Sequence, residues 1–140
     1  METTIDELVG NFSLLDDWED RYRYVIELGQ GLPPYPEQFR DEVHKVNGCV
    51  SQVWLHADVD GAADPTIRFS GDSDAHIVRG LVAIMIIALS GKRASEIHDF
   101  DIESTVKSLG LDEHLTPQRS NGLRAMIDRM KHTANAAIMH

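Results

Sequence analysis

The single cysteine of this 140-residue chain is the side chain best suited to covalent chemistry. Cys49 has no second thiol with which to form an internal disulfide, and one thiolate is a poor start for a metal or cluster site. Asn47-Gly48 comes directly before it, and this dipeptide is a strong turn signal that places the sulfur at a bend. Such a cysteine is either a reactive thiolate or an inert packing residue, and the spacing alone leaves both interpretations open.

Two further segments hold residues that could support chemistry. Gly71-Asp72-Ser73-Asp74-Ala75 places two carboxylates before an apolar run, where they would act as a turn and helix cap. Arg119 follows Thr116-Pro117 in the first turn of a predicted helix, where the helix dipole disfavours a cation. A residue placed against its local preference indicates a tertiary role, although a solvated arginine is the ordinary interpretation.

Metal, phosphate and nucleic-acid chemistry find little support in the sequence. Gly29-Gln30-Gly31 precedes prolines rather than a helix, so it lacks the context of a phosphate-binding loop. The formal net charge of −10 repels a phosphate backbone. No two histidines stand at metal-ligand spacing; the histidines are His44, His56, His76, His98, His114, His132 and His140. We therefore expect no metal site and no nucleic-acid partner.

Length and composition indicate one domain spanning residues 1–140 in a reducing compartment. A chain of this size buries a single core, and one cysteine argues against a disulfide-stapled secreted fold. The first twenty residues carry seven acids and no lysine or arginine, unlike a targeting segment. The longest uncharged apolar run, Leu81–Leu89, is far short of the ~20 residues that span a membrane. We expect a cytoplasmic protein without a membrane span.

The helices that must position these residues follow from hydrophobic spacing and capping signals. Thr3 or Thr4 is expected to cap a first helix that Gly10-Asn11 interrupts, and a second helix is expected to end at Leu28-Gly29 with a left-handed glycine. The run from Ala75 to Ser90 is apolar nearly all round, which predicts a central buried helix. We also predict a short turn capped by Ser95, a helix over Ile102–Leu109, and a long helix that begins at Pro117.

Strand patterns occupy the middle of the chain. Val43–Val46 and Val50–Val59 predict a hairpin with Cys49 in its connection, and Thr66–Ser70 predicts a third strand. Three antiparallel strands with one apolar face need helices to cover that face. The sequence therefore predicts a helix-rich α+β fold with a three-stranded antiparallel sheet.

Seven blocks of sequence, taken in order, resemble the SufE family of sulfur acceptors for cysteine desulfurases, which includes the CsdE proteins. The resemblance runs from about Phe12 to Met130, nearly the whole chain. The blocks are Trp18-Glu19-Asp20-Arg21-Tyr22, Ile26-Glu27-Leu28-Gly29, Val46-Asn47-Gly48-Cys49-Val50-Ser51-Gln52-Val53-Trp54, Gly71-Asp72-Ser73-Asp74-Ala75, Ile77-Val78-Arg79-Gly80-Leu81, Leu115-Thr116-Pro117 and Arg119-Ser120-Asn121-Gly122-Leu123. It implies a SufE/IscU-like fold and argues against an inert Cys49.

The resemblance also implies a mechanism. A desulfurase that holds pyridoxal phosphate takes sulfur from free cysteine and holds it as a persulfide on its own cysteine. The Cys49 thiolate attacks the outer sulfur of that persulfide, and Cys49 then carries the sulfur to an iron–sulfur scaffold complex. The chain would stimulate the desulfurase, need no cofactor of its own, and act as a monomer or homodimer. It would be a sulfurtransferase-type carrier rather than a stand-alone enzyme.

The same resemblance implies roles for residues around Cys49. Arg119 maps onto an arginine near the cysteine loop, where a cation would lower the pKa of the thiol or hold the partner. The loop itself is expected to be mobile and to rest against an apolar hollow. Support of the loop or contact with the partner is expected from the neighbouring residues Gly48, Ser51, Gln52, Asp72 and Asp74.

A cysteine-nucleophile hydrolase or acyltransferase is the alternative function. It would need a histidine and an acid arranged around Cys49.

Overall fold

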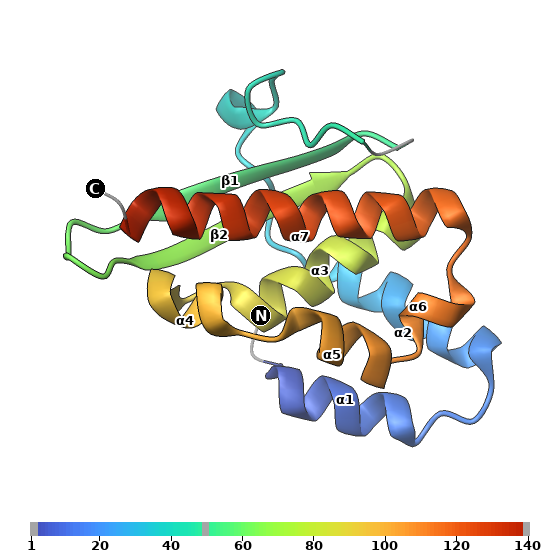
Figure 1. Cartoon of the computed structure of the whole chain (residues 1–140). Coiled ribbons are helices and arrows are strands. Elements are labelled where there is room, and N and C mark those ends of the chain that lie inside the picture. Colours follow the sequence, from blue (N-terminus) through green and yellow to red (C-terminus); the bar gives the residue numbers. More distant parts are fainter. Residues whose placement is uncertain (1–2, 49–50, 139–140) are drawn as a thin grey trace.

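A three-stranded antiparallel sheet and the helices packed against it make up this α+β protein, shown as a computed structural model in Figure 1. The structure describes residues 3–48 and 51–138. The strands are β1 (Val53–Val59), β2 (Thr66–Ser73) and β3 (Lys92–Arg93), in the order β1-β2-β3. The helices are α1 (Ile5–Ser13), α2 (Trp18–Gln30), α3 (His76–Leu89), α4 (Ala94–Asp99), α5 (Ile102–Ser108), α6 (Leu111–His114) and α7 (Pro117–Ile138), with a 3-10 turn η1 (Glu37–Phe39).

The predicted fold class is confirmed, but one predicted strand is wrong. Val43–Val46 does not form a strand, because it makes only an isolated bridge, between Lys45 and Trp54 of β1. The third strand is instead β3, which pairs with the start of β2 at Ile67 and Lys92. A strand of two residues is too short to show an alternating pattern, so the sequence held no signal for it.

Strand β2 continues through the segment that the sequence predicted to be a turn. Gly71, Asp72 and Ser73 pair with Leu55, Trp54 and Val53 of β1. A side chain at residue 71 would collide with the core, because a Cβ atom there would lie 2.6 Å from a methyl group of Val82. Glycine at position 71 therefore serves close packing inside a strand, and the turn prediction for Gly71–Asp74 is wrong.

Helices α1 and α2 both run past the glycines that were expected to end them. The hydroxyl of Thr4 caps α1 as predicted by accepting a hydrogen bond from the Glu7 amide. The helix then continues beyond Gly10 because Phe12 is buried on the core. Helix α2 carries Gly29 inside it and ends at Gly31, whose φ of −81° is not left-handed.

The core lies where α3 crosses α2 and packs on β2, with α7 along the same side of the sheet (Figure 1). Helix α3 is buried nearly all round, as its uniformly apolar pattern predicted. Leu123, Met126 and Met130 of α7 face this core. Strand β1 therefore has Val53 and Leu55 on the helix side and Trp54 on the opposite side.

Among the described residues, no helix is both long enough and apolar enough to cross a bilayer.

Candidate functional site

A hollow of about 340 Å³ beside α7 brings together residues that the sequence placed far apart. Its described lining comes from the segment that follows Cys49, from α3 and from the first three turns of α7. The lining residues are Ser51, Val78, Thr116, Gln118, Arg119, Gly122 and Met126. Ser51 and Arg119 thus share one cavity, although 68 positions separate them in the chain. Cys49 itself lies outside the described residues.

Arg119 contributes the positive charge of this hollow. Its backbone N–H donates to the hydroxyl of Thr116 at 3.3 Å, which satisfies an amide in the first turn of α7. The side chain is exposed, and no carboxylate within residues 3–48 and 51–138 forms an ion pair with it. Its guanidinium is therefore available to an anion that enters the hollow.

The segment that enters the Cys49 region lies against α7. Gly48 has a left-handed backbone with φ +93°, which favours glycine at this position. A Cβ atom on it would lie 3.4 Å from the Cβ atom of Ala125. Two residues earlier, the Val46 amide donates to the carbonyl of Val53 at 2.8 Å. The turn predicted at Asn47-Gly48 thus begins beside β1 and reaches the face of α7.

The segment that leaves the Cys49 region is held by Asp74. The amide of Gln52 donates to the Asp74 carboxylate at 3.0 Å, and the Asp74 amide donates to the Gln52 carbonyl at 3.3 Å. No side chain caps α3, whose N-cap residue is Ala75, so Asp74 does not perform the capping role that the sequence suggested. The carboxylate fixes the start of β1 instead.

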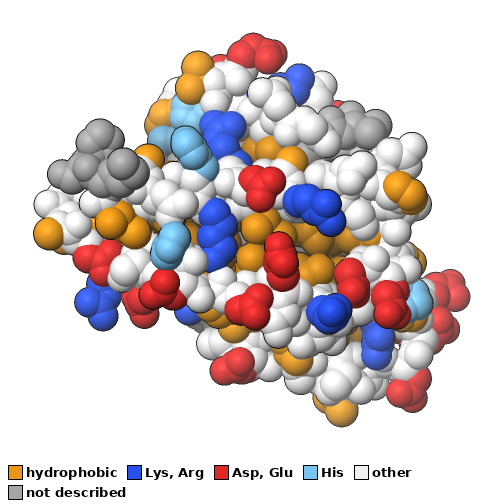
Figure 2. All heavy atoms as spheres, in the orientation of Figure 1, with side chains coloured by type: hydrophobic (Ala, Val, Ile, Leu, Met, Phe, Trp, Pro, Cys, Tyr) orange, Lys and Arg blue, Asp and Glu red, His pale blue; other side chains and the backbone are white. Residues whose placement is uncertain are grey.

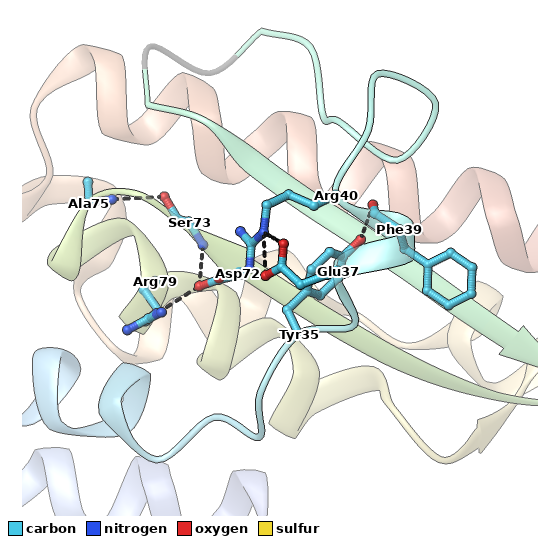
Figure 3. Close-up of polar contacts among 8 residues, drawn as sticks. All are labelled: Tyr35, Glu37, Phe39, Arg40, Asp72, Ser73, Ala75 and Arg79. Atoms are coloured by element: carbon cyan, nitrogen blue, oxygen red, sulfur yellow. Dashed lines mark hydrogen bonds and ion pairs between the residues drawn. The ribbon is translucent and has the colours of Figure 1, made fainter.

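Asp72 lies between two arginines (Figure 3) and is not among the residues that line the hollow. Its carboxylate accepts from Arg79 of α3 at 2.8 Å and from Arg40, which follows η1, at 2.8 Å. The Arg40 guanidinium also lies over the ring of Trp54, with 4.7 Å from its carbon to the ring centroid. Burial alone would raise the pKa of Asp72, but the bonds from Arg79 and Arg40 outweigh it and hold the pKa below its ordinary value. Asp72 is a structural link between η1, β2 and α3.

Replacement of Asp72 by asparagine should therefore destabilise the fold by about 2 kcal/mol at pH 7. This is below the usual cost of breaking a buried ion pair, because both arginines remain partly exposed to water. A lowered folded-state pKa gives stability that is present above the unfolded value of about 3.9 and is lost as pH falls through the folded value. Urea unfolding of wild type and Asp72→Asn at pH 7 and pH ~3 should show the difference shrinking in acid.

Asp128→Asn is the matched control for this prediction. Asp128 is exposed on α7, and the described residues give it no ion pair, so its loss should change stability by less than about 0.5 kcal/mol at either pH. If the two substitutions changed the free energy of unfolding equally, the ion pairs of Asp72 would not stabilise the fold.

Two histidines meet on the outer face of β1, a contact that the sequence did not indicate. The rings of His44 and His56 lie 5.1 Å apart, and His56 stacks on Phe39 with centroids 3.6 Å apart. Each histidine has one carboxylate partner, Asp41 or Asp58. Over the described residues, no group of three or more His, Cys, Asp or Glu side chains is placed to hold a metal ion.

A different hollow, of about 530 Å³, lies between α5, α6 and α7 and contains none of the predicted site residues. Figure 2 shows an apolar floor bordered by charged side chains of both signs on the face that carries these helices. Two of the predicted site residues line the smaller hollow, and Asp72 does not. Ser51 and Arg119 line that hollow, and Gly48 lies against Ala125 of α7. Gln52 and Asp74 are hydrogen-bonded to each other.

Sequence comparison identifies similar proteins over nearly the whole chain. Residues 6–134 match the family described as "SufE: Fe-S metabolism associated domain". An uncharacterized SufE-like protein of Rhizobium meliloti is 55% identical over 138 residues, covering 97% of this chain and 98% of that protein. An uncharacterized SufE-like protein of Rhizobium etli is 52% identical over 132 residues, covering 94% of this chain and 89% of that protein.

A solved structure supports the fold independently of these sequences. The solution structure of a hypothetical protein from Thermus thermophilus superimposes with a TM-score of 0.77 and 23% identity. It covers 97% of this chain and 96% of the other. At that level of identity the likeness concerns the fold alone.

Proposed function

This chain belongs to the SufE family and has a role in iron–sulfur metabolism, and from that premise we propose that Cys49 accepts sulfur from a cysteine desulfurase. The Cys49 thiolate attacks the outer sulfur of a persulfide on the desulfurase. The bond between the two donor sulfurs breaks, the desulfurase cysteine leaves as a thiolate, and Cys49 becomes the persulfide. The transfer needs no external oxidant or reductant.

One observation carries the proposal. The hollow next to the Cys49 segment combines Ser51, two positions after the cysteine, with the available guanidinium of Arg119. A cation near a thiol favours the thiolate, and the product persulfide is also an anion. An anion that enters this hollow would gain charge stabilisation from Arg119, which supports a thiolate nucleophile and a persulfide product there.

The single thiol also fits a relay better than a scaffold. Assembly of an iron–sulfur cluster uses several thiolate ligands, and this chain has one cysteine. We propose that the chain passes its sulfur to a scaffold complex, uses no cofactor of its own, and stimulates the desulfurase whose pyridoxal phosphate performs the carbon–sulfur chemistry. A compartment that keeps thiols reduced, such as the cytoplasm, suits this chemistry.

The hydrolase or acyltransferase alternative has less support. Such enzymes need a general base beside the nucleophile, most often a histidine. None of the described residues that line the hollow is a histidine. No observation on the described residues favours this alternative.

Intact-mass measurement tests the proposed function. The protein is incubated with a cysteine desulfurase and free cysteine, and we expect added mass in steps of about 32 Da, one sulfur atom each, that reductant removes. Protein that stays unmodified while the desulfurase turns over would refute the carrier function. Turnover of a chromogenic ester that requires Cys49 would support the hydrolase alternative.

Arg119→Ala should slow persulfide uptake by about tenfold, the lower end of what a lost charge-assisted hydrogen bond costs. Stability should hardly change, because the side chain is exposed. The uptake rate is followed by quenched-flow mass measurement, and the melting temperature is recorded in parallel.

Two further variants separate the effect of the charge at position 119 from the loss of any exposed arginine of α7. Arg119→Lys keeps the charge and should retain most of the rate, whereas Arg124→Ala removes an exposed arginine of α7 that lines the other hollow. Uptake by Arg119→Ala at the rate of Arg124→Ala would exclude Arg119 from the site.

A further inference from the structure

The segment that leads into Asn47-Gly48 has two edges, and only one of them faces the sheet. The carbonyl of His44 accepts from the Leu55 amide at 2.9 Å, and the Val46 amide donates to the carbonyl of Val53 at 2.8 Å. Lys45 forms its bridge to Trp54 between these two bonds, so its own carbonyl points away from β1, and Val43 belongs to the turn that comes before the bridge.

Arg129 of α7 occupies that outer edge. Its guanidinium donates to the carbonyl of Val43 at 2.7 Å and to the carbonyl of Lys45 at 3.3 Å. The guanidinium is a rigid fork of N–H donors, so it binds two carbonyls at once with little loss of freedom. The segment 43–46 is thus held between β1 on one side and a single side chain of α7 on the other.

The same helix continues toward the candidate site. Arg129 lies one helical turn after Ala125, which Gly48 approaches, and about three turns after Arg119 in the hollow. On the other side of residue 49, Gln52 is fixed by Asp74. The chain between residues 46 and 52 is therefore anchored at both ends, to α7 and β1 before Cys49 and to Asp74 after it.

We propose that Arg129 is a positioning residue for sulfur transfer, which fixes the segment 43–48 on α7 and so limits the arrangements open to the adjoining Cys49. The inference rests on the proposed function. It acts through the backbone of described residues and requires no contact between Arg129 and sulfur. Arg129 was not among the residues that the sequence indicated, because its partners lie 84 and 86 positions earlier.

The test compares three variants of the full chain. Arg129→Met removes both hydrogen bonds but keeps the apolar stem. Arg129→Lys keeps a cation that reaches one carbonyl. Arg124→Met is the control, because Arg124 is an exposed arginine of the same helix that lines the hollow between α5, α6 and α7.

Persulfide uptake is measured at saturating and at low concentrations of desulfurase. For Arg129→Met we expect the saturated rate to fall about tenfold, the order of effect that re-ordering one or two residues costs, with the half-saturation concentration changed less than twofold. Arg129→Lys should recover part of the rate, and Arg124→Met should match wild type. If Arg129 only stabilised the fold, the folded fraction of the Arg129→Met protein would take up sulfur at the wild-type rate.

A second measurement does not depend on sulfur transfer. A nitroxide attached to Cys49, the only thiol, reports the mobility of that position by electron paramagnetic resonance. Arg129→Met should increase the mobile component, and Arg124→Met should not. If wild type takes up no sulfur, the proposed function fails while the spectra still decide whether Arg129 restrains the segment.

Two results would overturn the inference. One is an Arg129→Met variant whose spectrum and saturated rate equal those of Arg124→Met. The other concerns Arg129→Lys, which replaces Arg129→Met in the test if Arg129→Met does not fold. A rate and a spectrum of Arg129→Lys equal to those of wild type would then exclude the positioning role.

Discussion

Cys49→Ala should abolish sulfur uptake and leave the fold unchanged. The thiol is the nucleophile of the proposed transfer, and the chain has no second cysteine to replace it. Wild type incubated with desulfurase and cysteine should gain steps of about 32 Da, while the variant should gain none. The expected loss exceeds about a thousandfold, because it removes the reacting atom rather than a supporting contact.

Two controls separate this result from damage to the protein. Circular dichroism and the melting temperature of Cys49→Ala should match wild type, because the substitution removes a single sulfur atom and the chain has no second cysteine with which it could form a disulfide. Cys49→Ser keeps the size of the side chain and should also take up no sulfur, since a hydroxyl is a far weaker nucleophile toward sulfur. Sulfur retained on either variant would show that Cys49 is not the acceptor.

Gly80→Ala should destabilise the protein by about 3 kcal/mol or more, the largest stability effect that we expect. Gly80 lies on α3 where it crosses α2, and a Cβ atom on it would overlap the backbone carbonyl of Val25. The partner glycine is Gly29, whose Cβ would lie 2.7 Å from the Gly80 amide nitrogen. Because both obstacles are backbone atoms within helices, the two helices must separate to make room.

Gly10→Ala is the matched control on helix α1. A Cβ atom at residue 10 meets nothing within 4 Å, so alanine should stabilise the helix by about 0.5–1 kcal/mol through its greater helix propensity. Chemical denaturation of the two variants and wild type measures both changes. A Gly80→Ala protein as stable as wild type would contradict the close crossing of α2 and α3.

Hydrophobic spacing was sufficient for most of the helices. The burial of α3 was predicted because apolar residues fill nearly all of its positions, and α7 was predicted from its hydrophobic spacing and its start at Pro117. The Thr4 cap was predicted for a similar reason, since it depends on residues within one turn of each other. Predictions of this kind succeed because the interactions that decide them are local.

Glycines and acids were misjudged where distant contacts decide their role. Gly29 was predicted to end α2, yet the close approach of Gly80 is the better explanation for a glycine at this position. Asp74 was expected to cap α3, yet it holds the Gln52 backbone 22 positions earlier. The local sequence gives the same signal for a cap as for a carboxylate that binds elsewhere, so it could not distinguish them.

By itself the sequence determined the α+β class, the family and the residue proposed to carry sulfur, because helix periodicity, ordered motifs and a single cysteine are all visible in one dimension. Only the tertiary structure decided which residues surround that cysteine's segment. It joined Arg119 to Ser51 in one hollow, placed Asp72 between two arginines, and brought Arg129 to the carbonyls of residues 43 and 45. Most of these contacts join positions that are 32 or more apart in the chain, and the contact between Asp72 and Arg79 depends on the direction of the two side chains. The folding of the chain, rather than local preference, brings such groups together.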